Sequence, residues 1–339
     1  MVVLYLAVNK RRVNCLSIQK YIEFLKNKLN KKFMVKVIAI ILALLVLLEV
    51  GACFIIHSAV FTTGGAPSFA RVEWKDNLNN KWLKDNAQKV TLENRDGKEI
   101  TALELKNKVF SDSYVILCHP YGKTSYSMGD FAKHFYDLGF NILLPDARGY
   151  GDSPYKYISM GYLDRLDVVD WVNSIVEKDE NARIILFGVS MGGACVAGAS
   201  GEDLPSNVKC VVADSCYATV YDLMKEEVED NFGLPALLTA NILSLLNRVK
   251  CGWDFKDGDI LKLVENTELP ILFIHGENDE VVFIKQSNDL FMACENEDRE
   301  QYVINEGSHG MGYMEDSERY WITVDEFMLN HLTRKNIEK

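Results

Sequence analysis

Residues 183–194, RIILFGVSMGGA, constrain the fold most, because they join a short apolar run to the start of a helix through a serine flanked by glycines. Ile184 to Phe187 are too short a run for a helix and are typical of a strand buried in a parallel sheet. Glycines on both sides of Ser190 suit a turn too tight for a Cβ. The small residues that follow suit a helix lying close to the sheet, with its N-terminal amides directed at the serine.

The pattern from Gly188 to Gly192, G-x-S-x-G, is that of a nucleophile elbow, although an isolated match also fits a plain glycine-rich turn. A serine hydroxyl is a weak nucleophile at neutral pH. Catalysis would therefore require a histidine base and an acid that orients it, later in the chain and in the order Ser, Asp or Glu, His. Suitable residues follow in that order.

Charge is distributed unevenly along the chain. Residues 1–36 hold nine Lys and Arg against one acidic residue, Glu23, a net of +8. Because the whole chain of 339 residues carries −11, the rest carries −19. Such an acidic body lacks the basic face that displaces counterions from phosphates, which argues against nucleic acid as a partner. The composition, 48% hydrophobic and 25% charged, is that of a globular protein of one large domain or two.

The eight cysteines form no C-x-x-C pair and no cysteine–histidine spacing suited to zinc, so neither a metal nor another cofactor is predicted. Several lie within apolar runs, which favours a role as small buried hydrophobic residues. A disulfide that involves Cys251 or Cys294 is the alternative.

Val37 to Ile56 form an apolar run of twenty residues with a single charge, Glu49, which is the length needed to cross a bilayer as a helix. Basic residues precede the run and do not immediately follow it. This predicts a single-pass protein of the cell membrane, with a cytoplasmic N-terminus and an extracytoplasmic body. The run is longer than the usual signal-peptide core of roughly 7 to 15 residues, which favours retention over cleavage. A lipoprotein site at Cys53 and a buried core helix are weaker alternatives.

We expect five regions along the chain. If translation starts at Met34, most of the basic segment over 1–36 is an upstream extension of the reading frame. The regions are a basic segment over 1–36, a transmembrane anchor or signal-anchor over 37–60, a linker over 61–87 with an amphipathic stretch around Trp74, Trp82 and Leu83, a globular domain over 88–333, and a tail over 334–339.

Within the globular domain a hairpin with an Asp-Gly turn is predicted over 90–105. Strands and helices then alternate, which implies a parallel sheet covered on both faces, with ligands at the carboxyl ends of its strands. The further strands are predicted at 114–118, 141–144, 184–187, 209–213, 271–274 and 301–304, and helices at 131–138, 163–176 and 317–332.

Nearly sixty residues separate the strand at 209–213 from the strand at 271–274, more than one crossover requires. Residues 223–230 are charged and helical in pattern, and an apolar run extends to Leu246. This predicts a small helical lid over about 218–256. Ordinary crossover helices packed on the sheet are the alternative.

Five stretches in this order make the chain from about 88 to 333 resemble the α/β-hydrolase superfamily, and most of all its bacterial esterase, lipase and serine-aminopeptidase-like members. The resemblance implies a mostly parallel sheet with helices on both faces and a helical lid, preceded here by the apolar helix. The stretches are Leu117–Gly122, Asp146–Ser153, Gly188–Gly192, Ile274–Val282 and Gly307–Gly310.

In this family pattern Asp279, after the strand at 271–274 and at the start of the next helical segment, is the expected acid of the triad. A helix N-cap role is its alternative. His309, in a glycine-flanked loop after the last strand, is the expected base. His275 is expected to be structural. Glu277 and Glu280 are weaker candidates for the acid.

Attack on a carbonyl creates an oxyanion that needs preorganised donors. By analogy with the family the donors are the backbone amides of Met191, directly after Ser190, and of Tyr121. Here Pro120 stands where the family usually has glycine, and proline has no N–H, so Tyr121 must donate. The stretch Asp146–Ser153 is interpreted as a structural brace beneath the site.

These residues predict a serine hydrolase in which Ser190 attacks a carboxylic ester, His309 carries the proton and Asp279 orients it, with an acyl-enzyme that water releases. A small ester or a short peptide is the expected substrate. Amide or peptide cleavage is the main alternative, because the same triad serves both reactions. Acyl transfer and a non-catalytic binding module are further alternatives.

Overall fold

The computed structural model describes residues 19–20, 23, 31–62 and 77–333. The chain divides into two compact units, Met1–Cys53 and Phe54–Lys339. The predicted basic segment lies largely outside the described residues, as do most of the linker, Trp74 and the tail.

Helix α2, Lys31–Val60, contains the predicted apolar run. Within the described residues, Phe33–Val60 is the one helix long and apolar enough to cross a membrane, with a mean hydropathy of 2.9 over its most apolar window. A signal sequence near the N-terminus passes the same test of length and composition as a membrane anchor.

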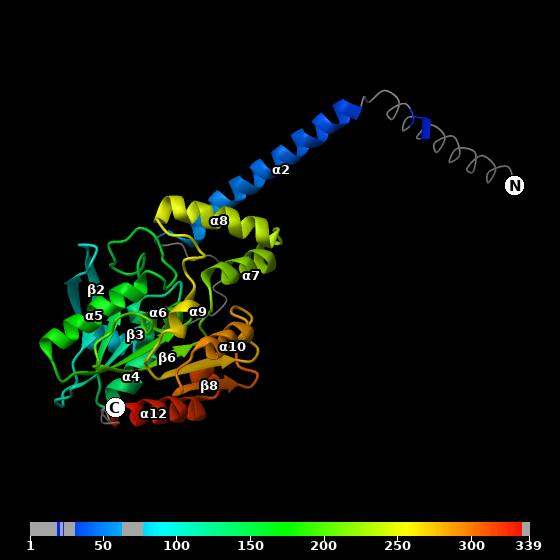
Figure 1. The fold of residues 1–339 in the computed structure, drawn as a ribbon. Helices are drawn as coiled ribbons and strands as arrows, with labels where there is room; N and C mark the ends of the chain where they lie inside the picture. Colours follow the sequence, from blue (N-terminus) through cyan, green and yellow to red (C-terminus); the bar gives the residue numbers. More distant parts are fainter. Residues whose placement is uncertain (1–18, 21–22, 24–30, 63–76, 334–339) are drawn as a thin grey trace. The chain divides into compact units, whose positions relative to one another are not determined.

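The second unit is built on one eight-stranded sheet in the order β1-β2-β4-β3-β5-β6-β7-β8 (Figure 1). The hairpin β1–β2 and the pairing of β2 with β4 are antiparallel, and all other pairs are parallel. The described strands are β1 Gln88–Glu93, β2 Glu99–Leu105, β3 Ser113–Cys118, β4 Asn141–Pro145, β5 Arg183–Val189, β6 Val208–Asp214, β7 Ile271–Gly276 and β8 Arg299–Ile304.

Helices cover both faces of this sheet (Figure 1). Helices α4 and α12 share one face, where Phe131 of α4 lies 5.7 Å from the ring of Trp321 of α12, and α5 and α6 share the other. The predicted fold is confirmed. The remaining elements are α3 Leu78–Asn86, η1 Ser125–Met128, α4 Gly129–Asp137, α5 Asp164–Lys178, α6 Met191–Ala199, α7 Val220–Phe232, α8 Ala236–Cys251, α9 Ile260–Glu265, α10 Ile284–Ala293, α11 Gly312–Glu315 and α12 Ser317–Thr333.

Helices α7 and α8 form an insertion between β6 and α9, where the sequence predicts the lid. Its two ends meet: Thr219 and Asp259 form an isolated β-bridge, and the amide of Val220 donates to the carbonyl oxygen of Gly258 at 2.9 Å. The insertion is therefore closed at its base, like a hairpin made of helices.

The end of α2 is built into the second unit. The side chain of Phe61 is fully buried, and its ring stacks on Phe255 with centroids 5.0 Å apart. Its carbonyl oxygen accepts from the amide of Ile158 at 3.0 Å, and Thr62 forms a bridge with Tyr157. Residues 61 and 62, expected to begin a linker, thus pack in the hydrolase unit.

Helix α3, within the expected linker, is also docked on the sheet unit. Leu83 is fully buried in the core, and the side-chain oxygen of Asn80 accepts from the amide of Gly129 at 2.9 Å. Asn77 and Asn79 both donate to the carboxylate of Asp130 at 2.6 Å. These contacts tie α3 to the start of α4.

None of the seven cysteines in the described part of the chain forms a disulfide there. Six are buried, as predicted for small hydrophobic residues, and Cys251 is half-buried. The alternative of a disulfide through Cys251 or Cys294 is wrong for the described part of the chain, since neither has a bonded partner there. Cys15 lies outside the described residues.

Candidate active site

The turn between β5 and α6 places Ser190 at a sharp apex. Its backbone has φ +57° and ψ −117°, a strained conformation for a residue with a side chain. A Cβ on Gly188 would lie 2.0 Å from the carbonyl oxygen of Gly192, and a Cβ on Gly192 would lie 2.1 Å from that of Cys118. The two glycines are therefore required because backbone packs directly on backbone at this turn.

The three residues predicted as a triad meet at the carboxyl ends of the strands. His309 Nε2 lies 2.8 Å from Ser190 Oγ, and His309 Nδ1 lies 2.7 Å from Asp279 Oδ2. Because a carboxylate can only accept, Nδ1 donates to Asp279, which leaves Nε2 to accept from the serine hydroxyl. All three side chains are buried.

Asp279 lies in the loop between β7 and α10, so it does not open a helix as the sequence suggested. Its Oδ1 accepts from the amides of Val281 at 2.9 Å and Val282 at 2.8 Å, while Oδ2 faces His309 and, at 3.2 Å, His275 Nε2. Burial raises the pKa of this carboxyl, but the two histidines outweigh burial and hold the pKa below its usual range. Asp279 is therefore ionised.

His275 is fully buried at the end of β7, and its Nε2 donates to the carbonyl oxygen of Val282 at 2.7 Å. Burial lowers the pKa of His275, but the carboxylate of Asp279 outweighs it and raises the pKa. His275 thus contacts Oδ2 of Asp279, whereas Val281 bonds to Oδ1, and the bond from His275 to Val282 holds this loop.

A second buried network, which the sequence analysis missed, holds the loop that carries His309. The amide of Gly310 donates to Ser215 Oγ at 3.0 Å, and Ser215 Oγ donates to Asp214 Oδ1 at 2.8 Å. Tyr320 donates to Asp214 Oδ2 at 2.7 Å. The sequence could have indicated this network through the position of Asp214 at the carboxyl end of β6, because side chains at the carboxyl ends of the strands lie near the site. Burial raises the pKa of Asp214.

The loop after β3 carries the expected oxyanion donor Tyr121. His119 Nδ1 lies 2.9 Å from the carbonyl oxygen of Pro120, and His119 Nε2 accepts from the amide of Ala147 at 3.0 Å. Nε2 therefore carries no proton and the ring is neutral, in keeping with burial, which lowers its pKa. The amide of Gly122 donates to the hydroxyl of Tyr150 at 3.0 Å, which fixes the other side of Tyr121.

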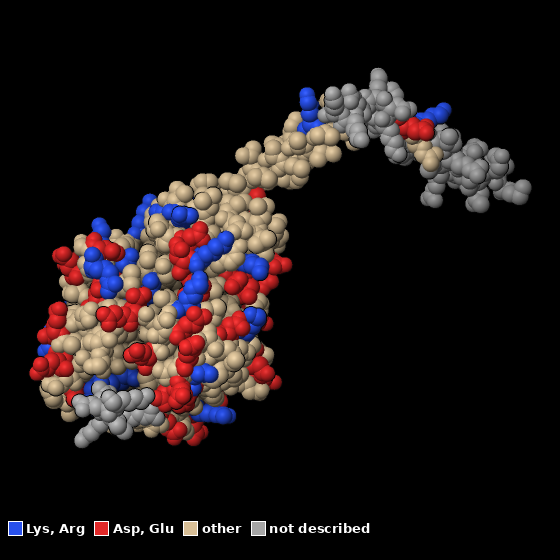
Figure 2. Space-filling view, in the orientation of Figure 1, with Lys and Arg blue, Asp and Glu red and all other residues tan. Residues whose placement is uncertain are grey.

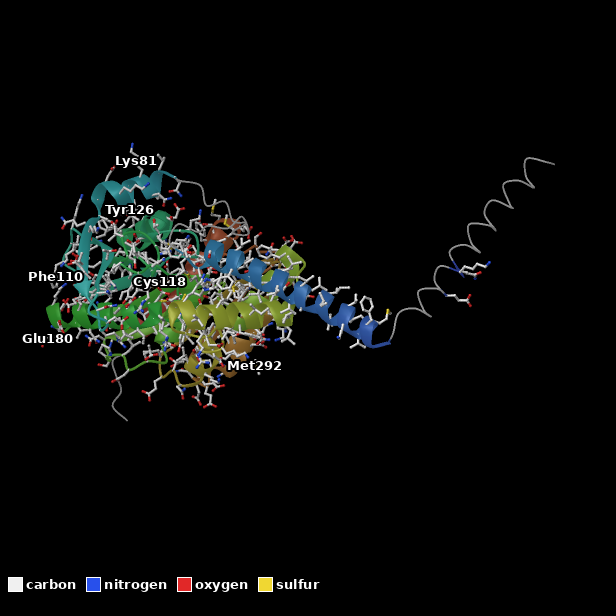
Figure 3. The ribbon with its side chains drawn as sticks, turned by 90° about the horizontal axis from the view of Figure 1, so that it is seen from above. Lys81, Phe110, Cys118, Tyr126, Glu180 and Met292 are labelled. Atoms are coloured by element: carbon white, nitrogen blue, oxygen red, sulfur yellow. The ribbon has the colours of Figure 1, made fainter. Side chains whose placement is uncertain are left out.

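The side chain of Tyr121 reaches the end of α2, where its hydroxyl donates to the carbonyl oxygen of Val60 at 2.7 Å. The other expected donor, the amide of Met191, is the first of α6 and has no acceptor within its helix. The loop of Tyr121 adjoins α6, because the carbonyl oxygens of Cys118 and His119 face Gly192. Figure 3 labels Cys118 within the sheet unit.

The stretch Asp146–Ser153 makes buried contacts that suit the predicted brace. Asp146 accepts from Ser125 Oγ at 2.8 Å and from Thr101 Oγ1 at 3.1 Å. Arg148 pairs with Asp167 through two bonds of 2.7 and 2.8 Å. Burial raises the pKa of Asp167 despite this arginine. These bonds join the loop after β4 to η1, β2 and α5.

Sheet order, helix layers and the strand-turn-helix at Ser190 define the class of fold: the chain has the α/β-hydrolase fold. The model of the family described as "Serine aminopeptidase, S33" matches residues 111–250. The chain is 24% identical to the uncharacterized protein YqkD of Bacillus subtilis over 217 residues, which is 64% of this chain and 71% of that protein.

Two further similarities concern the membrane and the fold. An uncharacterized membrane protein of Saccharomyces cerevisiae is 24% identical over 247 residues, 71% of this chain and 79% of its own length. The solved esterase Pf2001 of Pyrococcus furiosus has a TM-score of 0.62 and 22% identity, over 76% of this chain and 97% of its own. At that identity the likeness concerns the fold.

We expect Asp279→Asn to weaken the pH dependence of stability on the acid side. The folded-state pKa of Asp279 lies below the unfolded value of about 4, so its carboxylate stabilises the fold above that pH. This stabilisation is lost as the pH falls through the folded-state pKa. Denaturant unfolding of the full chain in detergent should thus show a deficit in the variant that is large near neutral pH and shrinks toward about pH 3.

Glu277→Gln is the matched control, because this exposed carboxyl lies two residues away and should give a curve parallel to that of the unaltered protein. An Asp279→Asn deficit that is the same at neutral and acid pH would contradict the assignment of Asp279 as a stabilising carboxylate.

Proposed function

We propose that the protein is a membrane-anchored serine hydrolase that cleaves carboxylic esters through an acyl-enzyme. The observation that carries the proposal is the continuous hydrogen-bonded line from Ser190 Oγ through His309 to Asp279. Its two distances, 2.8 and 2.7 Å, are those of a nucleophile and base ready to exchange a proton.

In the proposed reaction, Ser190 Oγ attacks the ester carbonyl while His309 Nε2 takes the hydroxyl proton. The imidazolium that forms is stabilised by the ionised Asp279, whose second oxygen is held by two backbone amides. His309 then gives the proton to the leaving alkoxide. Water, activated by the same histidine, attacks the acyl-enzyme and releases the acid and free Ser190.

The tetrahedral intermediate places a negative charge on the former carbonyl oxygen. The amide of Met191 at the start of α6 and that of Tyr121 are the proposed donors, each contributing about 3 kcal/mol to the transition state. The helix dipole of α6 adds to this, because its positive end lies at Ser190. The contacts of His119 and Tyr150 support preorganisation of the Tyr121 loop.

The remaining parts of the proposal concern topology and access. The basic residues before α2 favour a cytoplasmic N-terminus and an extracytoplasmic hydrolase domain over about 88–333, held by a retained anchor. The insertion α7–α8 is the proposed lid over about 218–256, since it follows β6 at the edge of the sheet where Ser190 lies.

Labelling with a fluorophosphonate tests the nucleophile directly. We expect the full chain to be labelled at Ser190, because the reagent traps a serine activated by histidine. Ser190→Ala should abolish labelling and lower ester hydrolysis by about 10³-fold or more. Ser308→Ala, which alters an exposed serine next to His309, should keep both. Folded protein that is not labelled would support a binding module instead.

A peptidase is the second candidate, favoured by the family that matches residues 111–250. Kinetics with p-nitrophenyl esters of graded chain length and with aminoacyl anilides distinguish the two. We expect a higher kcat/KM for an ester, because an alkoxide leaves the tetrahedral intermediate more readily than an anilide nitrogen, which must first be protonated. A higher kcat/KM for an anilide would establish the peptidase.

The contact between Tyr121 and Val60 generates a prediction about turnover. Tyr121→Phe removes a hydrogen bond worth about 1 kcal/mol, so the oxyanion loop should be less well fixed and kcat should fall about fivefold with KM unchanged. Tyr126→Phe is the control, since this side chain is exposed on η1 (Figure 3). An unchanged kcat in Tyr121→Phe would show that the bond from Tyr121 to Val60 does not contribute to turnover.

A further inference from the structure

The face that helix α8 turns to solvent is largely apolar, with Asn241 as an exposed polar residue before the last turn. Its inner face buries Thr239, Ala240, Leu243, Ser244 and Asn247. Its outer face exposes the outer stripe, which we define as Leu237, Leu238, Leu245 and Val249, with exposed fractions of 64, 45, 60 and 77%. Single exposed apolar side chains are ordinary, but three leucines and a valine along one helical face form an apolar surface that is unfavourable in water.

The charge of α8 also differs from that of the domain. Its sixteen residues contain no Asp or Glu, and its two charges, Arg248 and Lys250, lie in the last turn. The chain after residue 36 is otherwise strongly acidic. Figure 2 shows mostly uncharged surface over α8 with basic atoms at one end, while acidic residues are spread over the rest of this view of the domain. An apolar stripe beside basic residues is typical of helices that lie in a membrane interface.

The end of α2 indicates what covers this face. His57 Nε2 lies 3.2 Å from Asn247 Oδ1, and Lys250 donates to Ser58 Oγ at 3.5 Å and lies 5.1 Å from the ring of Phe54. These α2 residues continue, in one unbroken helix, the segment that is long and apolar enough to cross a bilayer. If that segment spans, the chain leaves the bilayer near Phe54 to Ser58, and these residues contact α8.

We propose that α8 lies on the bilayer surface, with the outer stripe among the acyl chains and with Arg248 and Lys250 at the headgroups of anionic lipids. The proposal rests on the membrane anchor of the proposed function and adds a second, interfacial contact to it. The anchor already holds the domain at the membrane surface. The outer stripe therefore does not have to supply the membrane affinity, and its contact with lipid only orients the domain.

The test uses the full chain reconstituted in vesicles of phosphatidylcholine and phosphatidylglycerol, with the environment-sensitive fluorophore nitrobenzoxadiazole attached at Leu245→Cys. Cys251→Ser removes the half-buried cysteine and Cys15→Ser removes the cysteine outside the described residues, so that the fluorophore reacts at the introduced position. Phe110→Cys is the matched control. This residue is 93% exposed and precedes β3, at the opposite edge of the parallel sheet from α8 (Figure 3).

We expect a blue-shifted emission at position 245 that doxyl-labelled lipids quench, and an emission at position 110 that they leave unchanged. Quenching at 245 should weaken in vesicles of phosphatidylcholine alone and in the variant that also carries Leu238→Glu and Val249→Glu. Equal emission and quenching at the two positions would overturn the proposal.

Two other outcomes would also overturn it. A blue shift at 245 that depends on the ratio of protein to lipid and is not quenched by doxyl lipids would assign the outer stripe to a second copy of the chain. If the protein does not float with the vesicles, both the proposed membrane anchor and the proposed contact of α8 with the bilayer are wrong. Hydrolysis of a water-soluble p-nitrophenyl ester, measured in the same samples, reports the enzymatic proposal separately.

Discussion

The close approach of three backbone segments at the elbow is the constraint on which the site depends. The carbonyl oxygen of Cys118 lies 2.1 Å from where a Cβ on Gly192 would be, and that of Gly192 lies 2.0 Å from where a Cβ on Gly188 would be. This contact forces Ser190 into a positive φ, and a bond of 2.7 Å from its amide to the carbonyl oxygen of Asp214 fixes it there. The strain of the serine, of order 1–3 kcal/mol, is offset by the packing of the mostly buried strands β3, β5 and β6 around it.

Around this fixed serine, the other reactive groups are held mainly by backbone hydrogen bonds at strand ends. Asp279 is fixed by two amides, and the His309 loop by the bond from Gly310 to Ser215. Both Asp279 and Asp214 are buried carboxyls, but their partners differ. Two imidazoles face Asp279 and lower its pKa, whereas Asp214 receives two neutral hydroxyls, which do not outweigh burial, and its pKa rises.

The sequence predicted those parts of the fold that have a local signature. Strand and helix periodicity, the Asp-Gly turn and the glycines at Ser190 each act within a few residues, and the mostly parallel sheet was implied by the family resemblance. The docking of Phe61 on Phe255 and the bond from Tyr320 to Asp214 join residues more than one hundred positions apart. No local pattern encodes such pairs, and polar, glycine-rich neighbours made residues 61–87 look like a linker.

The docked end of α2 bears on whether the apolar helix is retained. A cleaved signal sequence leaves the mature domain free of contacts with it, yet Phe61 is fully buried here and Val60 accepts the hydrogen bond of Tyr121. Removing the chain up to residue 61 would expose the core around Phe255, at about 1.5–3 kcal/mol for the lost burial of one phenylalanine. It would also release the side chain of an expected oxyanion donor. These contacts make Val60 and Phe61 part of the second unit, which argues against cleavage after the end of α2.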